Sequence, residues 1–414
     1  MSQSPASRPP LLDFDVARAQ LLSYASAPVA TESLPLLQAC GRVLAQSVSS
    51  PMDVPAFANS SMDGYAIYPA HAQQTPIQLT VTQRIAAGSQ GIALEPGQAA
   101  RIFTGAPVPA GTYAVVPQEV VHAEGDQIRI DQPVTAGDFV RAQGEDIARG
   151  HDIILAGKKL KPADLALAAS VGITHVTTYK PLRVAILLTG DELVEPGTPL
   201  GPGQIYNSNR YWLQSLLTQI GCEVLDPGIV RDTPQETRDA LAHASQKADV
   251  IITCGGVSVG EEDHVRAAVA SMGRIDLWQI AMKPGKPLAY GKAAEADFIG
   301  LPGNPVSAFV TFVLMGLPFL QLRMGLPVQA LKPSLMTAAF AWPKPDRRRE
   351  FIRVRQQTSD EGHAVLERWP NQGSGVMSSV AWADGLVDIQ PGQVIEPGDA
   401  VPYLSLADLL DAAR

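Results

Sequence analysis

The chain has 414 residues, of which 46% are hydrophobic and 18% are charged, and its formal net charge is −9. This length predicts about two to four domains, and the composition is typical of folded globular proteins. The acidic charge argues against binding to nucleic acids, and the N-terminus lacks the pattern of a secretory signal. The best candidate for a membrane helix, residues 308–322, is broken by Gly316 and Pro318 and falls short of the ~18 residues required.

Cysteine and histidine are too dispersed for a structural metal site. Cys40, Cys222 and Cys254 lie far apart and form neither a metal-binding pattern nor a disulfide framework, which fits a reducing cytoplasm. The seven histidines form no closely spaced pair, so a zinc site is not expected. The sequence therefore predicts a cytoplasmic protein without a membrane or nucleic-acid partner.

The first part of the chain shows helical segments that flank a β-rich insertion. Near the N-terminus an aspartate can cap a helix, and Pro162 begins a second helix. Between them, short β-like runs such as IQLTVTQRI are separated by glycine and proline. We therefore expect a mainly helical domain from residues 1–54 and 146–180, with a β-rich domain inserted at residues 55–145.

Strands and helices then alternate in the manner of a parallel α/β sheet. The apolar runs RVAILLT and DVIITC predict buried strands, and a capping box at Thr233 with Pro234 begins an intervening helix. We place a three-layer α/β domain with a mostly parallel sheet at residues 181–326. Short strands follow it, and residues 327–414 are expected to form a small β-barrel-like domain. The fold class is therefore multidomain α/β plus β.

Three loops rich in glycine or proline follow strands of the α/β domain. Ligands bind at the carboxyl ends of strands in open parallel sheets, so three converging loops favour a ligand site over ordinary turns. Glycines let backbone N–H groups approach an anion, but neither a dinucleotide fingerprint nor a P-loop lysine motif is present. The loop residues that are candidates for ligand contacts are Thr189, Gly190, Gly255, Gly256, Ser258, Pro302, Gly303 and Pro305.

A short cationic turn, Lys283-Pro284-Gly285-Lys286-Pro287, follows the strand WQIAM. The two prolines stiffen this turn, so the two lysine charges stay close together. A solvated surface loop is the plain alternative. In an acidic chain, however, a rigid lysine pair beside glycine loops suits an oxyanion or a phosphate.

Acidic residues recur beside turns along the chain. Each one alone is most simply explained as a helix cap or a turn residue. Together with a phosphate site they favour Mg²⁺, which takes one or two carboxylates along with substrate phosphates. These residues are Asp63, Asp146, Glu192, Asp232 and Asp263.

The motifs resemble those of the molybdopterin molybdenumtransferases, the family of the gephyrin E domain. SMDGYA at residues 61–66, RIFTGAPVP at 101–109 and GEDI at 144–147 are similar to family motifs. The three loops and the lysine turn of the α/β domain resemble the same family. Each motif alone is weak, but the set follows the family order over most of the chain, and the ordered set is highly specific.

The resemblance implies an elongated, L-shaped subunit of four domains and a homodimer, with the active cleft at or near its interface. The implied substrates are adenylyl-molybdopterin and molybdate. The implied reaction inserts molybdenum at the dithiolene and releases AMP, with Mg²⁺ as the cofactor. Transient contacts with molybdopterin adenylyltransferase and with the molybdoenzymes that receive the product are also implied.

By motif, the resemblance assigns two groups of residues, and it assigns the three loops to the pterin or nucleotide. Tyr113 stands where relatives often have an aspartate, so position 113 is left out of the site. The catalytic residues would be Asp63, Thr104, Asp146, Glu192, Asp232 and Asp263, with Asp63, Asp146, Asp232 and Asp263 as metal ligands. The residues that bind molybdate or phosphate would be Lys283, Lys286, Ser307, Arg353 and Ser374.

Two other functions stay open at the level of the sequence. A molybdopterin adenylyltransferase would share the α/β domain, but it would not need the about 180 residues that precede it. A non-catalytic, gephyrin-like scaffold would bind a partner peptide on a concave dimer surface. The acidic residues and the lysine pair favour the enzyme.

Overall fold

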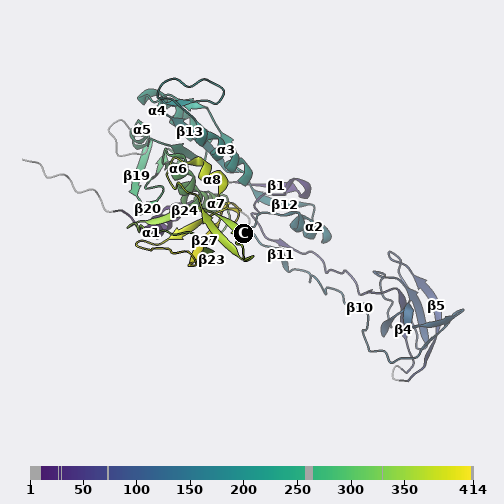
Figure 1. Ribbon diagram of the computed structural model, residues 1–414. Coiled ribbons are helices and arrows are strands. Elements are labelled where there is room, and N and C mark those ends of the chain that lie inside the picture. The colour runs from purple at the N-terminus through teal and green to yellow at the C-terminus, as the bar shows by residue number, and fades with distance from the viewer. Residues whose placement is uncertain are drawn as a thin grey trace, which may run out of the picture.

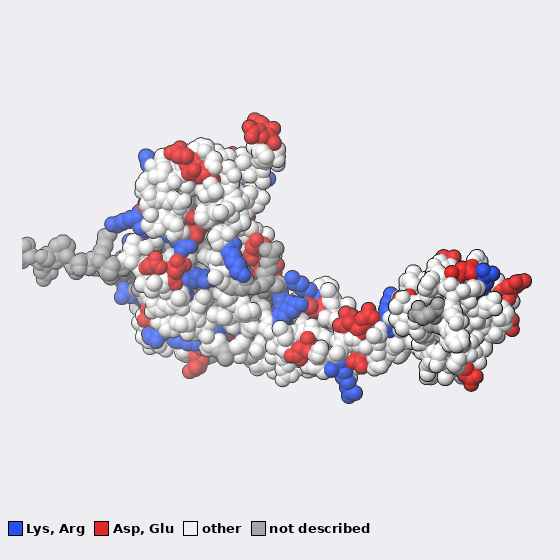
Figure 2. Space-filling model, turned by 90° about the horizontal axis from the view of Figure 1, so that it is seen from below, with Lys and Arg blue, Asp and Glu red and all other residues white. Residues whose placement is uncertain are grey.

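The structure is a computed structural model that describes most of the chain. It shows an elongated molecule in which an arm carries a small β-rich domain away from a larger body (Figure 1). Both signs of charge are mixed over the face of the body shown in Figure 2, so the net negative charge is not gathered there. The described residues are 11–26, 28, 30–71, 74–256, 264–328 and 330–411.

The arm ends in a six-stranded sheet with the strand order β7-β4-β6-β5-β9-β8. The neighbouring residues Ala66 and Ile67 of β4 belong to different apolar clusters, so both faces of the sheet are covered. Two antiparallel pairs, β2–β11 and β3–β10, form the stalk by which the chain enters and leaves the arm. The strands are β2 (Val48–Ser49), β3 (Asn59–Ser60), β4 (Gly64–Tyr68), β5 (Ile77–Ile85), β6 (Gln98–Ile102), β7 (Ala114–Pro117), β8 (His122–Glu124), β9 (Gln127–Ile130), β10 (Val140–Arg141) and β11 (Asp152–Ile154), and η2 (Gln118–Val120) follows β7.

The segments that flank the arm contain the two predicted helices, together with short strands that the sequence did not predict. Asp13 caps α1 by accepting hydrogen bonds from the backbone N–H groups of Asp15 and Val16. Pro162 opens α2. Strand pairing prevails over helix formation in part of the first segment, because β1 finds an antiparallel partner in β12. The elements are α1 (Phe14–Ser23), β1 (Thr31–Pro35), η1 (Leu36–Gln38), α2 (Pro162–Ser170) and β12 (His175–Tyr179).

The centre of the body is a three-layer α/β domain, as predicted. Its sheet has the order β16-β13-β18-β22-β21-β19, in which the first four strands are parallel and the last two are antiparallel to their neighbours. In β13, Ile186 and Leu188 face the cluster that includes α3, whereas Leu187 faces α4 and α5. The elements are β13 (Arg183–Thr189), β14 (Leu193–Val194), β15 (Ile205–Tyr206), α3 (Ser208–Ile220), β16 (Glu223–Leu225), β17 (Ile229–Val230), α4 (Pro234–Lys247), β18 (Val250–Cys254), α5 (His264–Met272), β19 (Gly273–Gln279), β21 (Pro287–Ala293) and β22 (Ala296–Leu301).

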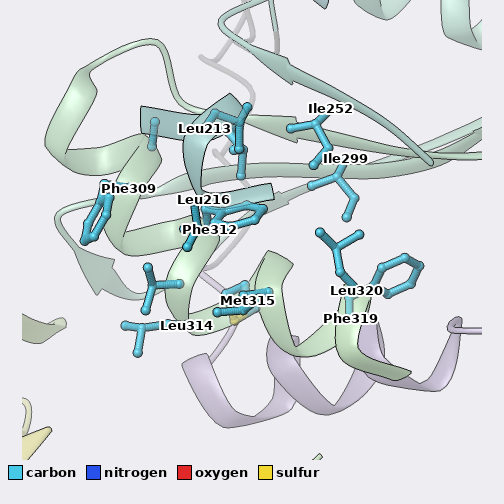
Figure 3. Packing of buried hydrophobic residues seen from close by; sticks show 14 of the residues in the cluster. Leu213, Leu216, Ile252, Ile299, Phe309, Phe312, Leu314, Met315, Phe319 and Leu320 are labelled. Atoms are coloured by element: carbon cyan, nitrogen blue, oxygen red, sulfur yellow. The ribbon is translucent and has the colours of Figure 1, made fainter. Parts of the chain in front are cut away.

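A long apolar helix closes this domain and runs without a break through Gly316 and Pro318. α6 (Pro305–Thr311) runs into the π-helical turn η3 (Phe312–Gly316) and then into α7 (Leu317–Arg323). Pro318 has no N–H to donate to Leu314, and the carbonyl oxygen of Leu314 instead accepts a hydrogen bond from Arg18 Nε at 3.2 Å. The helix is long and apolar enough to cross a membrane, but 83% of its apolar window is buried inside the molecule. Its side chains pack beneath the sheet (Figure 3), so it is a core helix.

The C-terminal part of the chain forms a small closed barrel, as predicted. Five strands close through the pairing of β24 with β26 around a separate apolar cluster. A sixth strand, β20, comes from the lysine turn and pairs in parallel with β24, which joins the barrel to the α/β domain. The elements are β20 (Met282–Lys283), β23 (Ser334–Ala338), β24 (Arg349–Thr358), β25 (Ala364–Arg368), α8 (Met377–Trp382), β26 (Gly385–Ile389), β27 (Ala400–Ser405) and α9 (Leu406–Leu410).

Candidate functional site

Two cavities meet at the carboxyl end of the parallel sheet. The lysine cavity, of about 490 Å³, lies between the loops after β18 and β22, the turn after β20, and the C-terminal barrel. The glutamate cavity, of about 450 Å³, lies between the loops after β13, β18 and β22. Both cavities are bordered by Gly255, Gly256, Gly303 and Asn304. The polar side chains of the lysine cavity are those of Lys283, Lys286, Asn304, Ser307, Arg348, Gln372 and Ser374.

The charge of Lys283 is compensated by two carboxylates. Its Nζ lies 2.7 Å from Oε1 of Glu350 and 3.5 Å from Oδ2 of Asp346. The pairing of β20 with β24 sets this contact, because it places Lys283 directly opposite Glu350. Lys283 lines the cavity, but these two carboxylates already offset its positive charge.

Lys286 is the cation of the turn whose charge is not compensated. It lines the lysine cavity, and it forms no ion pair with any residue that the structure describes. Gly285 holds the turn close to the long helix: its φ is +103°, and a Cβ there would lie 2.1 Å from Oγ1 of Thr311. A side chain at position 285 would therefore displace both lysines from the cavity.

The first turn of the long helix also borders the lysine cavity. Ser307 is 5% exposed and lines the cavity from this turn. The helix continues for 19 residues from Pro305, and its dipole favours an anion near the first turn, although Pro305 has no N–H and the N–H of Val306 donates to the Ser374 carbonyl. The amide of Asn304 donates to the Ser374 hydroxyl at 3.2 Å, which ties this end of the helix to the loop from the barrel.

Arg353 lies behind the cavity rather than in its described lining. It is 1% exposed, and its guanidinium donates to the Ser379 hydroxyl at 3.0 Å and to the Gly373 carbonyl at 3.2 Å. Burial lowers the pKa of Arg353 to about 10. Arg353 therefore braces the loop that presents Ser374, and it adds a buried positive charge behind that loop.

Arg348 is a lining residue that the sequence analysis missed. Its guanidinium holds Asp346 through Nη2 at 2.8 Å and Nε at 3.1 Å, and these bonds hold the pKa of Asp346 well below its usual range. The run Asp346 to Glu350, DRRRE, is rich in charge, but the sequence does not say which of its arginines faces a cavity. That choice depends on the pairing of β20 with β24.

The glutamate cavity contains two of the predicted catalytic carboxylates. Glu192 and Asp232 line it together with Thr189 and Gly190, from the ends of β13 and β17. The backbone N–H of Asp232 donates to the carboxylate of Asp191 at 3.4 Å, which links the two loops. The third loop contributes Pro302 to the lysine cavity and Pro305 to the glutamate cavity.

The remaining predicted residues that the structure describes belong to the arm and its stalk. Asp63 follows β3, and its carboxylate accepts hydrogen bonds from the backbone N–H and the hydroxyl of Thr104, both at 2.8 Å. These bonds lower the pKa of Asp63. The backbone N–H of Asp146 donates to Val54 in the stalk. None of these predicted residues lines either cavity, and in Figure 1 the arm lies far from β13.

Two predicted residues, Ser258 and Asp263, lie outside the described residues. Among those that are described, no group of three or more acidic, histidine or cysteine side chains could hold a metal ion. Asp63, Asp146 and Asp232, the predicted metal ligands that the structure describes, therefore do not form one group. Glu192 and Asp232 are the carboxylates that the described structure brings to the lining of one cavity.

Comparison with known proteins gives matches along most of the chain. Three family models match in order: the MoeA N-terminal region (domain I and II) at residues 12–172, a probable molybdopterin binding domain at 185–322, and the MoeA C-terminal region (domain IV) at 336–406. The molybdopterin molybdenumtransferase of Haemophilus influenzae is 40% identical, covering 89% of this chain and 92% of that protein. Molybdopterin molybdenumtransferase 2 of Mycobacterium tuberculosis is 36% identical, with coverages of 88% and 92%.

A solved structure shows the same fold. The molybdopterin biosynthesis MoeA protein of Pyrococcus horikoshii superposes with a TM-score of 0.81 at 27% sequence identity, covering 96% of this chain and all of that chain. The likeness therefore extends over the arm, the α/β domain and the C-terminal barrel together.

Proposed function

The chain belongs to the family of molybdopterin molybdenumtransferases, and on that premise we propose that its lysine cavity binds molybdate beside the pterin. As a member of this family it is an enzyme of molybdenum cofactor biosynthesis that inserts molybdenum into molybdopterin. The single observation that carries the assignment of the site is the contact between a cavity lined by cations and a cavity lined by carboxylates.

The two other functions considered from the sequence are not favoured. An adenylyltransferase would need only the α/β domain, whereas the family matches also cover residues 12–172 and 336–406. A scaffold without activity would not need the cations and hydroxyls that converge on the lysine cavity. Relatives named as molybdopterin molybdenumtransferases match across most of the chain, which supports the enzyme.

The side chains of the lysine cavity suit a tetrahedral dianion. Lys286 supplies a compact positive charge, and the hydroxyls of Ser307 and Ser374 can donate to oxyanion oxygens. The dipole of the long helix adds positive potential from the same side. These groups hold the anion in place, so the protein offsets the repulsion between molybdate and a phosphorylated substrate.

The glutamate cavity suits the pyrophosphate of adenylyl-molybdopterin. Glu192 and Asp232 have the chemistry of Mg²⁺ ligands, since Mg²⁺ commonly binds through one or two carboxylates together with substrate phosphates. When bound there, Mg²⁺ would offset negative charge on the pyrophosphate oxygens during release of AMP. Both cavities share the glycines of their common border, where Gly303 lies close to Gly255.

Binding measurements test the placement of molybdate. Full-length protein with bound pterin is titrated with molybdate, and Lys286→Ala is compared with Lys247→Ala, an exposed lysine at the end of α4. Lys247→Ala is expected to bind like the wild type. If Lys286→Ala also binds molybdate like the wild type, the lysine cavity is not the molybdate site.

A homodimer would explain why the predicted catalytic residues of the arm lie away from both cavities. In a two-fold dimer, the arm of one subunit can reach the cavities of the other, so Asp63, Thr104 and Asp146 would complete the partner's site. The hydrogen bonds from Thr104 keep the Asp63 carboxylate ionised and oriented on the exposed surface of the arm.

Mixed dimers test this arrangement. Subunits that carry Asp63→Asn and Lys286→Ala are co-expressed with different tags, and the mixed species is purified. If the arm acts on the partner, one site of the mixed dimer is intact, and it should show about half of wild-type turnover. If each arm serves its own subunit, both sites are damaged and the mixed dimer should be as inactive as the two parents.

We further propose that the enzyme works in the cytoplasm, where it would meet an adenylyltransferase and the molybdoenzymes transiently. The three cysteines support a reducing compartment, because all of them are free thiols in the structure.

A further inference from the structure

The cations of the lysine cavity are backed by carboxylates that do not line it. Lys283 contacts Glu350 at 2.7 Å and Asp346 at 3.5 Å, and Arg348 holds Asp346 with two side-chain hydrogen bonds. Glu350 is 2% exposed, and its second carboxylate oxygen accepts a hydrogen bond from the indole of Trp342 at 3.0 Å. Neither carboxylate can turn away into solvent without breaking these bonds.

The net positive charge of the described side chains around the cavity is equal in size to the negative charge of one molybdate ion. Lys283, Lys286 and Arg348 line the cavity, and Arg353 adds a fourth positive charge behind the loop 372–374. Two carboxylates, Asp346 and Glu350, offset two of these four charges. The described side chains therefore leave two net positive charges, which equals the charge of a molybdate dianion.

An enzyme that must pass its anion on gains nothing from very tight binding of that anion. Binding energy that is equal in the ground state and the transition state does not raise kcat. A cavity with four uncompensated cations would also bind sulfate and phosphate strongly, because they are tetrahedral oxyanions too. Carboxylates fixed behind the cations would lower this affinity while keeping the N–H donors in place.

We propose that Asp346 and Glu350 are counter-charges that hold down the oxyanion affinity of the lysine cavity and direct Lys283 and Arg348 toward the bound anion. This proposal rests on the proposed function of the cavity as the molybdate site. Both residues come from the barrel, so the barrel sets the electrostatics of a site whose lysines belong to the α/β domain. They act through other residues and are positioning residues.

The main test is Asp346→Asn, which removes one negative charge at almost constant size. Molybdate is titrated into the full-length protein, and turnover is measured with adenylyl-molybdopterin at varied molybdate. We expect the Kd and the KM for molybdate to fall by about three- to tenfold, because one carboxylate no longer repels the dianion at short range. We expect kcat not to rise, and inhibition by sulfate to strengthen by a similar factor.

Glu350→Gln provides a second variant, which removes the charge at almost constant size and whose single amide oxygen can keep one of the two contacts, with Lys283 or with Trp342. It should also tighten molybdate binding. Glu367→Gln, an exposed carboxylate on β25 of the same barrel, is the matched control and should bind like the wild type. A purely structural role for Asp346 or Glu350 would give weaker binding and would not produce this gain.

The outcomes separate this proposal from the one on which it rests. If Lys286→Ala leaves molybdate binding unchanged, the cavity is not the molybdate site and both proposals fall. If Lys286→Ala weakens binding, but folded Asp346→Asn and Glu350→Gln proteins bind molybdate no more tightly than the wild type, the counter-charge proposal alone is overturned.

Discussion

Charged side chains gather at both ends of β22. Their charges compensate one another at the amino end, whereas positive charge is in excess at the carboxyl end. At the amino end, Asp297 is fully buried and contacts the Tyr290 hydroxyl and Lys292 Nζ at 2.8 Å and Arg323 Nε at 2.9 Å. At the carboxyl end, the chain enters the loop that borders the lysine cavity, where Lys286 has no ion-pair partner among the described residues.

The difference shows what distinguishes a structural charge cluster from a binding site. Around Asp297 the carboxylate lies within ion-pair distance of two cations and accepts a hydrogen bond from a hydroxyl, so its charge is compensated within the chain. Around the lysine cavity the cations outnumber the carboxylates, and a space of about 490 Å³ lies beside them. The excess charge can be offset only by something that enters.

The largest expected effect is on stability at the amino end. Asp297→Ala leaves Lys292 and Arg323 without their buried carboxylate and should lower the free energy of unfolding by about 3–5 kcal/mol. Urea denaturation checks this value, with Glu295→Ala on the neighbouring exposed turn as the control. Molybdate affinity of the folded protein should not change. A loss of less than about 1 kcal/mol would contradict the structural role of this cluster.

The next effect is on binding at the carboxyl end. Lys286→Ala should weaken molybdate binding by about ten- to hundredfold, the usual effect of losing a charge-assisted hydrogen bond. Its unfolding free energy should stay close to that of the wild type, because Lys286 pairs with no described carboxylate. Lys286→Arg should restore binding poorly, since a planar guanidinium replaces a compact ammonium beside a tetrahedral ion.

Lys283→Ala should weaken molybdate binding less than Lys286→Ala does, although nothing in the sequence distinguishes the two lysines. The loss of Lys283 leaves the buried carboxylate of Glu350 without its ion-pair partner, so part of the cost appears in stability. Calorimetric titration and urea denaturation of both variants separate the two contributions. Equal effects of the two variants on molybdate affinity would contradict the difference in their charge compensation.

The sequence could predict the parts of the site that local patterns determine. The loops after the strands, the stiff lysine turn and the start of the long helix are all local, and the structure places Gly255, Lys286 and Ser307 around one cavity. The hydrogen bond that replaces the missing N–H donor of Pro318 was not predictable, because Arg18 is distant in sequence from its acceptor, the carbonyl oxygen of Leu314.

The residues that the sequence missed depend on contacts between distant segments. Glu350 meets Lys283 only because β20 pairs with β24, and Arg348 faces the cavity for the same reason. Charge runs such as DRRRE do not reveal which side chains will be neutralised. Likewise, the sequence places Asp63 in the inserted domain and Glu192 in the α/β domain, but only the fold shows that the arm lies far from the body.

The smallest expected effect concerns the acid side of the stability profile. Hydrogen bonds from Arg348 hold the pKa of Asp346 below its usual range in the folded protein. A depressed pKa stabilises the fold fully above the ordinary carboxyl value of about 4, and this contribution is lost as the pH falls from there toward the folded pKa.

In buffer without oxyanions, Asp346→Asn should therefore be less stable than the wild type at pH 7, by on the order of 1 kcal/mol because Asp346 is partly exposed. The gap should narrow as the pH falls below about 4, whereas Glu367→Gln should show no such convergence. A difference between Asp346→Asn and the wild type that stays constant from pH 7 to acid pH would mean that the contact between Asp346 and Arg348 does not contribute to folding, and that its role lies in the binding of the anion.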